Sequence, residues 1–278
     1  MYAHGAAVDV CADRVTSASR WIRAPRRCDD ARLRLVCLPH AGGAANFYHS
    51  WARWLPDGVE LLTVQYPGRQ DRIGEPCLSR MDDLAPEVVA ALRPWLDAPA
   101  PLVLFGHSMG AWVAFEVALR LETSLAYRPL GLLVSGQTAP HLPPLREWPG
   151  DTDEELFAEL RRLDGIDMES IEHPDLRELV MPAIRSDFQL VRDYPPRPPR
   201  RISAPIVALN GTTDPDVPLD QVDAWRDATL GAFRSHVFPG GHFYLTEHET
   251  QVADEVTRTL RWLTGDEEPA VPRPTRTP

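Results

Sequence analysis

The strongest constraint on the fold is a serine between two glycines, placed where a strand pattern changes into a helix pattern. Residues 102–105 are apolar and β-prone, Ser108 follows in the sequence GHSMG, and residues 111–120 have a helical pattern. Such a turn strains the backbone at the serine and lifts its hydroxyl to the carboxyl end of the strand. We expect Gly106 and Gly110 to flank it because a Cβ at either position would collide with the neighbouring strand or helix. The segment predicts a nucleophilic serine at a helix N-terminus, where backbone N–H groups can stabilise an oxyanion.

Strand and helix patterns alternate along most of the chain. The predicted strands cover residues 32–38, 60–66, 102–105, 129–135, 205–209 and 235–238. The predicted helices cover residues 46–55, 81–96, 111–120, 153–163, 174–192 and 247–263. This alternation predicts an α/β fold with a mostly parallel central sheet and helices on both faces.

The alternation breaks between residues 135 and 205, where two predicted helices follow one another with no strand between them. Ligands of such sheets bind beyond the carboxyl ends of the strands. We therefore interpret residues 140–200, approximately, as a helical lid insertion over Ser108, the alternative being extra helices packed on a remote edge. We expect one domain over residues 21–265, with disorder in residues 1–20, which lack periodicity, and in the charged, proline-rich residues 266–278.

Composition excludes several classes of function. The formal net charge of −11 opposes nucleic-acid binding, which calls for a basic surface. The sequence has neither an apolar run long enough to span a bilayer nor a signal-peptide pattern at its start, so we expect a cytoplasmic protein without membrane contact. The four cysteines lack the paired spacing of a zinc site, and we expect no metal ligands.

A serine hydroxyl needs a base within hydrogen-bond reach, and that base needs an orienting carboxylate. Among nine histidines, His242 is the best base because it follows the last predicted strand in the turn PGGHF. His107 adjoins the serine and is expected to point elsewhere. Asp214 follows the strand at 205–209 and is the predicted acid, with Asp216 as the alternative.

Two backbone N–H groups are needed for the oxyanion hole. We expect one from Met109, the residue after the nucleophile, and one from Ala41 in the glycine-containing loop 39–44. His40 in the same loop is expected to shape the loop. In the lid, apolar residues recur at near-helical spacing, and Met181 and Phe188 are the residues we expect to line an acyl pocket.

Six short motifs together resemble the type II thioesterases of polyketide and nonribosomal peptide assembly lines. They are LPHAGG at 38–43, QYPGR at 65–69, FGHSMGA at 105–111, SGQTAP at 135–140, IRSDF at 184–188 and PGGHF at 239–243. The resemblance spans about residues 30–265 and implies an α/β-hydrolase fold. It also implies that Ser108, Asp214 and His242 occupy the triad positions, and that the substrates are aberrant or stalled acyl groups on the phosphopantetheine arm of acyl or peptidyl carrier proteins. Gln137 and Thr138 depart from the family pattern, as does the acidic tail.

Two other functions stay open at this point. The chain could be a serine esterase or lipase acting on free oxygen esters or acyl-CoA, or a catalytically inactive hydrolase fold that binds acyl groups. None of these needs a metal or a bound cofactor, and we expect a monomer. For carrier docking we expect a local positive patch at the lid exit, formed by Arg192, Arg197, Arg200 and Arg201.

Overall fold

The computed structural model describes residues 20–145, 148, 150, 152–163 and 173–266. The predicted disordered ends, residues 1–20 and 266–278, fall outside this range except for their innermost residues. Among the described residues, none of the helices combines the length and hydropathy that a membrane span requires.

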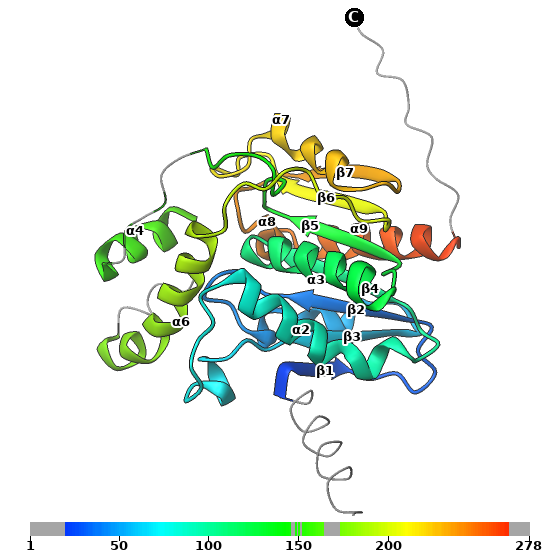
Figure 1. The fold of residues 1–278 in the computed structure, drawn as a ribbon, viewed down its shortest axis with the longest axis horizontal. Helices are drawn as coiled ribbons and strands as arrows, with labels where there is room; N and C mark the ends of the chain where they lie inside the picture. Colours follow the sequence, from blue (N-terminus) through cyan, green and yellow to red (C-terminus); the bar gives the residue numbers. More distant parts are fainter. Residues whose placement is uncertain (1–19, 146–147, 149, 151, 164–172, 267–278) are drawn as a thin grey trace, which may run out of the picture.

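A seven-stranded sheet forms the centre of the molecule, with the order β1-β3-β2-β4-β5-β6-β7 (Figure 1). The strands are β1 (Ile22–Arg26), β2 (Leu33–Leu38), β3 (Val59–Val64), β4 (Leu102–His107), β5 (Gly131–Ser135), β6 (Ile206–Gly211) and β7 (Phe233–Phe238). All neighbouring pairs are parallel except β1 with β3, which is antiparallel. The sequence did not predict β1, because its IRAPR sequence is short, charged and interrupted by proline, and lies at the sheet edge where proline is tolerated.

Helices cover both faces of the sheet, as the alternation predicted. The α-helices of the described residues are α2 (Met81–Leu96), α3 (Met109–Leu125), α4 (Asp153–Leu163), α6 (Pro174–Arg192), α7 (Leu219–Val222), α8 (Tyr244–Glu247) and α9 (Glu249–Thr264). Three segments are 3₁₀-helices, η1 (Ala45–Arg53), η2 (Gln70–Arg72) and η3 (Asp223–Ala228). The segment expected as an α-helix at residues 46–55 is therefore the 3₁₀-helix η1.

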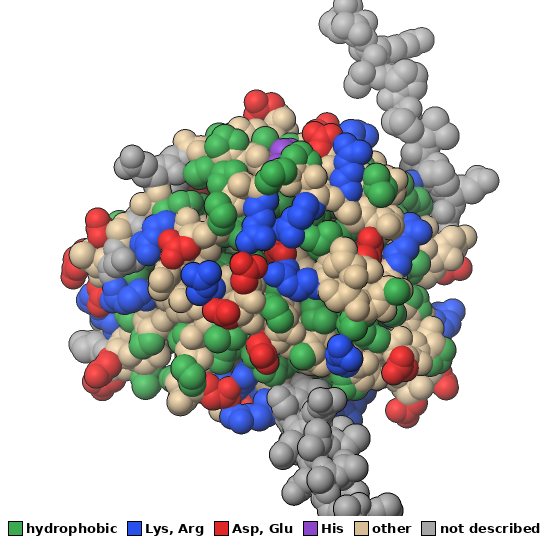
Figure 2. Space-filling view, viewed as in Figure 1, with side chains coloured by type: hydrophobic (Ala, Val, Ile, Leu, Met, Phe, Trp, Pro, Cys, Tyr) green, Lys and Arg blue, Asp and Glu red, His purple; other side chains and the backbone are tan. Residues whose placement is uncertain are grey.

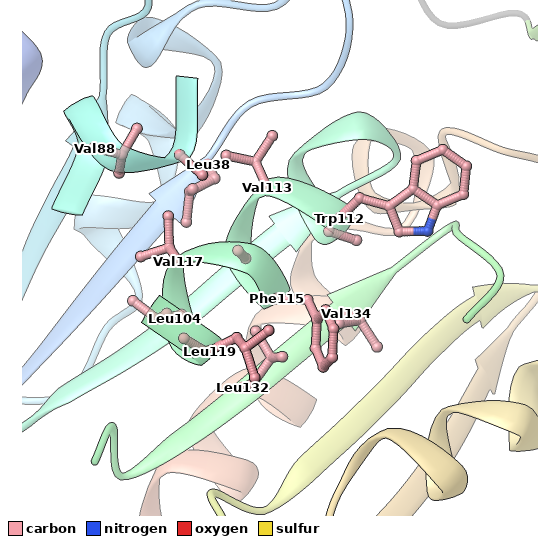
Figure 3. Close-up of a cluster of buried hydrophobic side chains, with 14 of the residues drawn as sticks. Leu38, Val88, Leu104, Trp112, Val113, Phe115, Val117, Leu119, Leu132 and Val134 are labelled. Atoms are coloured by element: carbon pink, nitrogen blue, oxygen red, sulfur yellow. The ribbon is translucent and has the colours of Figure 1, made fainter. Parts of the chain in front are cut away.

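Side chains of the parallel strands alternate between two buried clusters, as the two-residue period of a strand requires. In β4, Leu104 packs in the cluster under α2 and α3, whereas Val103 and Phe105 pack in the cluster under η1, α8 and α9. Figure 3 shows side chains of α3, among them Val113 and Phe115, against the sheet on the first of these faces. Burial on both faces explains why β4 is continuously apolar up to the elbow.

The two helices α4 and α6 lie together at one end of the sheet (Figure 1). They share a small apolar cluster of their own, formed by Leu156, Phe157, Leu160, Met181, Ile184 and Phe188. Both helices begin and end where the sequence predicted. Their place relative to Ser108 is shown by the cavity described below.

Candidate active site

Ser108 lies in a strained turn between β4 and α3. Its backbone dihedrals are φ 52° and ψ −124°, a conformation that L-residues with a side chain rarely adopt. A Cβ on Gly106 would lie 2.0 Å from the carbonyl oxygen of Gly110, and one on Gly110 would lie 2.1 Å from that of Leu38. The predicted reason for the two glycines is thus confirmed, and the turn holds Ser108 at the carboxyl edge of the sheet.

Two neighbouring loops bring His242 and Asp214 together. Gly211, at the end of β6, has no room for a side chain, because its Cβ would lie 2.2 Å from the Gly241 carbonyl oxygen. The loops are also joined by a hydrogen bond from the Thr213 N–H to the Gly240 carbonyl, at 2.9 Å. Between them, His242 Nδ1 lies 2.9 Å from Asp214 Oδ2, and both side chains are almost fully buried.

The proton on His242 follows from this contact. An ionised carboxylate can only accept, so Nδ1 carries the hydrogen and Nε2 keeps its lone pair. Nε2 is buried and has no hydrogen-bond partner among the described residues. His242 is therefore oriented as a base with an available acceptor nitrogen.

Asp216, the alternative acid, has a different role. Its carboxylate accepts a hydrogen bond from Arg162 of α4 at 2.5 Å, and its backbone N–H donates to Asp214 Oδ1 at 2.9 Å. Asp216 thus helps to hold the Asp214 carboxylate in place, and Asp214 is the acid that hydrogen-bonds the imidazole.

Two further histidines surround His242, and neither takes part as a charged group. Burial, with smaller contributions from His242 and Arg69, lowers the pKa of His40 to about 3. Burial and the neighbouring histidines also hold the pKa of His107 well below its usual range. As expected, His107 points away from the nucleophile, with its Nδ1 2.9 Å from Ser135 Oγ. Near neutral pH these two rings are uncharged, so they do not repel a proton on His242.

Ser108 and His242 line one cavity of about 110 Å³ beneath the lid. The apolar part of its wall combines Trp112, Leu142, Trp148, Leu163, Val191 and Tyr194 with several prolines. Gln137 and Thr138, the two departures from the family pattern, also line the cavity. Their backbone carbonyls accept hydrogen bonds from the indole N–H groups of Trp225 and Trp112, at 2.7 and 2.8 Å. Residues from both lid helices thus contact the space next to Ser108, which agrees with the lid interpretation.

The residues expected to form the oxyanion hole lie beside the serine. Met109 is the first residue of α3 and is fully buried, and Ala41 lines the cavity together with Ser108. His40 packs edge-on against Phe47 and Phe243, with ring centroids 4.6 and 4.9 Å away, which fits its expected role in shaping the loop.

Only one of the two predicted pocket residues of the lid reaches the cavity. Phe188 lines it, whereas Met181 packs between α4 and α6 and borders a separate surface hollow with Cys77 and Arg185. The two residues share a helix face but are two turns apart, about 10 Å along the axis. The expectation for Met181 is therefore wrong.

The expected positive patch at the lid exit is largely neutralised. Arg200 binds the fully buried Glu116, and Arg197 lies 3.5 Å from Asp82. Arg192 pairs with Asp193, and Arg201 donates to the carbonyl oxygen of Asp227. On the face that carries α2 and α3, acidic and basic side chains are interspersed (Figure 2). Arg197 and Arg200 thus fasten the lid exit to α2 and α3, and all four arginines have partners, which opposes a free docking patch.

Sequence reasoning missed a buried ion pair next to the site. Arg69 donates to both carboxylate oxygens of Asp187, at 2.6 and 2.8 Å, across 118 residues of sequence. Both residues stand in motifs that carried the family resemblance, but nothing in those motifs shows that they meet. Among the described residues, no cluster of His, Cys, Asp or Glu is arranged to hold a metal ion.

The fold and site define a class: a parallel-sheet α/β hydrolase with its serine on a strand-to-helix elbow. A model of the thioesterase domain family matches residues 33–260. The chain is 42% identical to the thioesterase PikA5 of Streptomyces venezuelae over 254 residues, which cover 91% of this chain and 90% of the relative.

Solved structures give the same result. The type II thioesterase BorB from the borrelidin biosynthetic cluster superposes with a TM-score of 0.77 at 42% identity, covering 87% of this chain and 98% of BorB. YbtT, a type II thioesterase from the yersiniabactin pathway, also gives a TM-score of 0.77, at 30% identity and with 86% and 97% of the two chains covered. The chain therefore belongs to the thioesterase family and has the α/β-hydrolase fold.

Proposed function

We propose that this chain is a type II thioesterase that removes aberrant or stalled acyl groups from the phosphopantetheine arm of acyl or peptidyl carrier proteins. One observation carries the mechanism. His242 is bound through Nδ1 to the buried Asp214, and its Nε2 has no partner among the described residues, while Ser108 lines the same cavity. An imidazole oriented by a buried carboxylate, beside a serine in the same cavity, supports serine acyl transfer, in which Nε2 comes within hydrogen-bond reach of Oγ.

In the proposed acylation step, His242 Nε2 takes the proton of the Ser108 hydroxyl as Oγ attacks the thioester carbonyl carbon. The carbonyl oxygen becomes an oxyanion, which the N–H groups of Met109 and Ala41 stabilise. When this intermediate collapses, the carbon–sulfur bond breaks and the sulfur takes the proton from His242. The acyl group remains on Ser108 and the pantetheine thiol departs.

Deacylation repeats these steps with water as the nucleophile. His242 removes a proton from water, which attacks the acyl ester, and then returns that proton to Ser108 Oγ. Asp214 stays ionised throughout and stabilises the imidazolium in both steps. The product is a free carboxylic acid.

The related proteins support a carrier-bound substrate. BorB comes from the borrelidin biosynthetic cluster, and YbtT comes from a pathway of nonribosomal peptide and polyketide synthesis. In this chain, the mainly apolar cavity wall beside Ser108 suits an acyl group more than a charged one. We further propose that the protein acts as a cytoplasmic monomer. Light scattering after gel filtration measures the molar mass, which is 31.1 kDa for a monomer.

The decisive experiment loads one carrier protein with a panel of acyl groups and measures their release, beside the same acyl groups on free pantetheine, on CoA and on p-nitrophenol. The proposal expects kcat/KM to be highest for the carrier-bound thioesters and Ser108→Ala to abolish release. Preference for p-nitrophenyl esters or acyl-CoA would instead indicate an esterase or a free-thioester hydrolase. Binding of acyl-carrier without turnover, and no labelling of Ser108 by a fluorophosphonate, would indicate an acyl-binding protein.

A further inference from the structure

The loop that carries Ala41 contains a tight turn whose central peptide can take two orientations. The Gly43 N–H donates to the His40 carbonyl oxygen at 2.9 Å, and Gly42 has φ 73°, whereas Ala41 is not among the residues with positive φ. These features define a type II turn over residues 40–43. A type I turn over the same residues differs by a flip of the peptide between Ala41 and Gly42, and glycine at the third position accepts either form.

A carboxylate from the lid holds this peptide in one orientation. The Gly42 N–H donates to Asp187 Oδ2 at 2.8 Å, and Asp187 belongs to α6, one residue before the cavity-lining Phe188. If the peptide flipped, the Ala41 carbonyl oxygen would face the negative carboxylate in place of the N–H. The charge on Asp187 therefore attracts one form of the turn and repels the other.

Arg69, in the loop after β3, holds the same turn, and we call Arg69 and Asp187 together the clamp. It donates to both oxygens of Asp187 and, at 3.0 Å, to the carbonyl oxygen of Gly43, at the far end of the same turn. Asp187 is 2% exposed and Arg69 is 7% exposed. Charge-assisted hydrogen bonds between groups buried from solvent to this extent are stronger than those at the surface.

The neighbours of Arg69 fasten the rest of the loop. The Tyr66 hydroxyl donates to the carbonyl oxygen of Pro39 at 3.3 Å, and Gln65 Oε1 accepts from the Ala45 N–H at 3.0 Å. The motif at 65–69 and the motif at 184–188 thus converge on one short loop. Neither motif has a role in the acyl-transfer steps described above.

We propose that Asp187 and Arg69 are positioning residues for the oxyanion hole. Because Asp187 belongs to α6, the oxyanion hole is complete only when this lid helix is packed against the loop of Ala41. Ala41 is the second residue of this turn and lines the cavity with Ser108, so bonds to Gly42 and Gly43 hold the backbone of Ala41 in a fixed place beside the nucleophile. A fixed backbone is what an N–H group needs in order to meet the oxyanion that develops on the substrate. This inference rests on the proposed acyl-transfer function and deepens it.

The test compares Asp187→Asn with Glu60→Gln. Asparagine keeps the volume of Asp187 but loses the charge. Both oxygens of Asp187 accept from N–H groups of Gly42 or Arg69, so the amide NH₂ of asparagine faces a donor in either orientation. Glu60 forms a similarly sheltered ion pair, 2.7 Å from Arg34, but near the start of β3, remote from the carboxyl edge. It controls for the general cost of losing a sheltered ion pair.

Five quantities are measured for each variant: the melting temperature, kcat and KM with p-nitrophenyl acetate, inhibition by an acyl trifluoromethyl ketone, and binding of a non-hydrolysable thioether analogue. The ketone forms a tetrahedral adduct whose oxygen occupies the oxyanion hole, whereas the thioether binds as a ground state. We expect Asp187→Asn to lower kcat by about 10- to 100-fold with little change in KM, and to weaken the ketone by a similar factor. The affinity of Asp187→Asn for the thioether should match that of wild type. The Glu60→Gln enzyme should match wild type in kcat, KM and the affinities for ketone and thioether.

A folded Asp187→Asn enzyme with wild-type kcat and ketone affinity would overturn the proposal and leave the pair a purely structural one. If Asp187→Asn does not fold, Gly42→Ala replaces it, since a Cβ disfavours the positive φ of the type II turn while the clamp is intact. It should again lower kcat and ketone affinity together, and wild-type values for both would refute the idea. This test uses a simple ester as substrate. If the wild-type enzyme did not hydrolyse carrier-bound thioesters, the proposed function would be contradicted, but the outcome of this test would be unaffected.

Discussion

Replacing Asp214 by asparagine tests the assignment of the orienting acid, and the structure decides how the new amide must sit. The backbone N–H of Asp216 donates to Oδ1 of Asp214 at 2.9 Å, so the amide oxygen of asparagine is needed at that position. The amide NH₂ group then takes the place of Oδ2, which lies 2.9 Å from His242 Nδ1. A donor now faces this nitrogen, and the imidazole must place its hydrogen on Nε2.

This tautomer cannot accept the proton of Ser108, so the loss should be large. For a triad in which the acid becomes an amide the fall in kcat is about 10⁴-fold, which corresponds to about 5 kcal/mol in the activation barrier. We expect about 10³- to 10⁴-fold for Asp214→Asn.

Asp216→Asn is the matched control, because it removes a carboxylate two residues away but keeps the backbone N–H that holds Asp214. It weakens the pair with Arg162, a partly exposed side chain, for which a contribution of about 0–1 kcal/mol is expected. Its kcat should therefore stay within about fivefold of wild type.

The assay follows thiol release from an acyl-pantetheine thioester with a disulfide dye, and circular dichroism confirms folding. If Asp216→Asn proved more damaging than Asp214→Asn, or if Asp214→Asn kept a tenth or more of the activity, the reasoning about the amide and the tautomer would be refuted.

Three further predictions follow from the same geometry. Ser108→Ala and His242→Ala should each lower kcat by roughly 10³-fold or more with unchanged circular dichroism, and a normal rate in either variant would remove that residue from the mechanism. Phe188→Trp should shift hydrolysis toward shorter acyl chains because Phe188 lines the cavity, whereas Met181→Trp should leave the chain-length profile unchanged; a panel of acyl-pantetheines measures both, and the reverse pattern would contradict the cavity assignment. Burial raises the pKa of Glu116, but the hydrogen bonds and charges of its partners outweigh burial and hold the pKa below the usual value of 4.5. The ionised carboxylate therefore stabilises the folded state above pH 4.5, and this contribution is lost as the pH falls through the lowered pKa. Glu116→Gln should cost about 1–3 kcal/mol in urea unfolding at pH 7 and progressively less below about pH 4, and a cost that grows with acidity would contradict this sign.

Several features could be predicted from sequence because they depend on neighbours in the chain. The elbow needs glycine two residues before and after Ser108. The clash at Gly106 is with backbone of the same strand-to-helix turn, whereas the clash at Gly110 is with Leu38 of the neighbouring strand. Helices α4 and α6 were located from periodicity alone. His242 and Asp214 were found because both follow strands, and the carboxyl ends of parallel strands share one edge of the sheet.

Other features were decided only when distant segments packed together. Asp214 and Asp216 are equivalent in the sequence, and only the contact between the loops after β6 and β7 shows which one meets the imidazole. Met181 and Phe188 have the same helical phase, so their difference depends on how far along α6 the core reaches. Arg197 and Arg200 of the lid exit looked free because their acidic partners lie on α2 and α3, far away in sequence.

The sequence by itself therefore determined the fold class, and it predicted the nucleophile, the base and a lid, since backbone sterics and periodicity act over a few residues. Tertiary structure alone decided the partner of each charge and which lid residue reaches the cavity. It also joined Arg69 to Asp187 across 118 residues. The physical reason is that a charged or polar side chain satisfies its hydrogen bonds with whatever group folding brings within about 3 Å, and no local pattern encodes that neighbour.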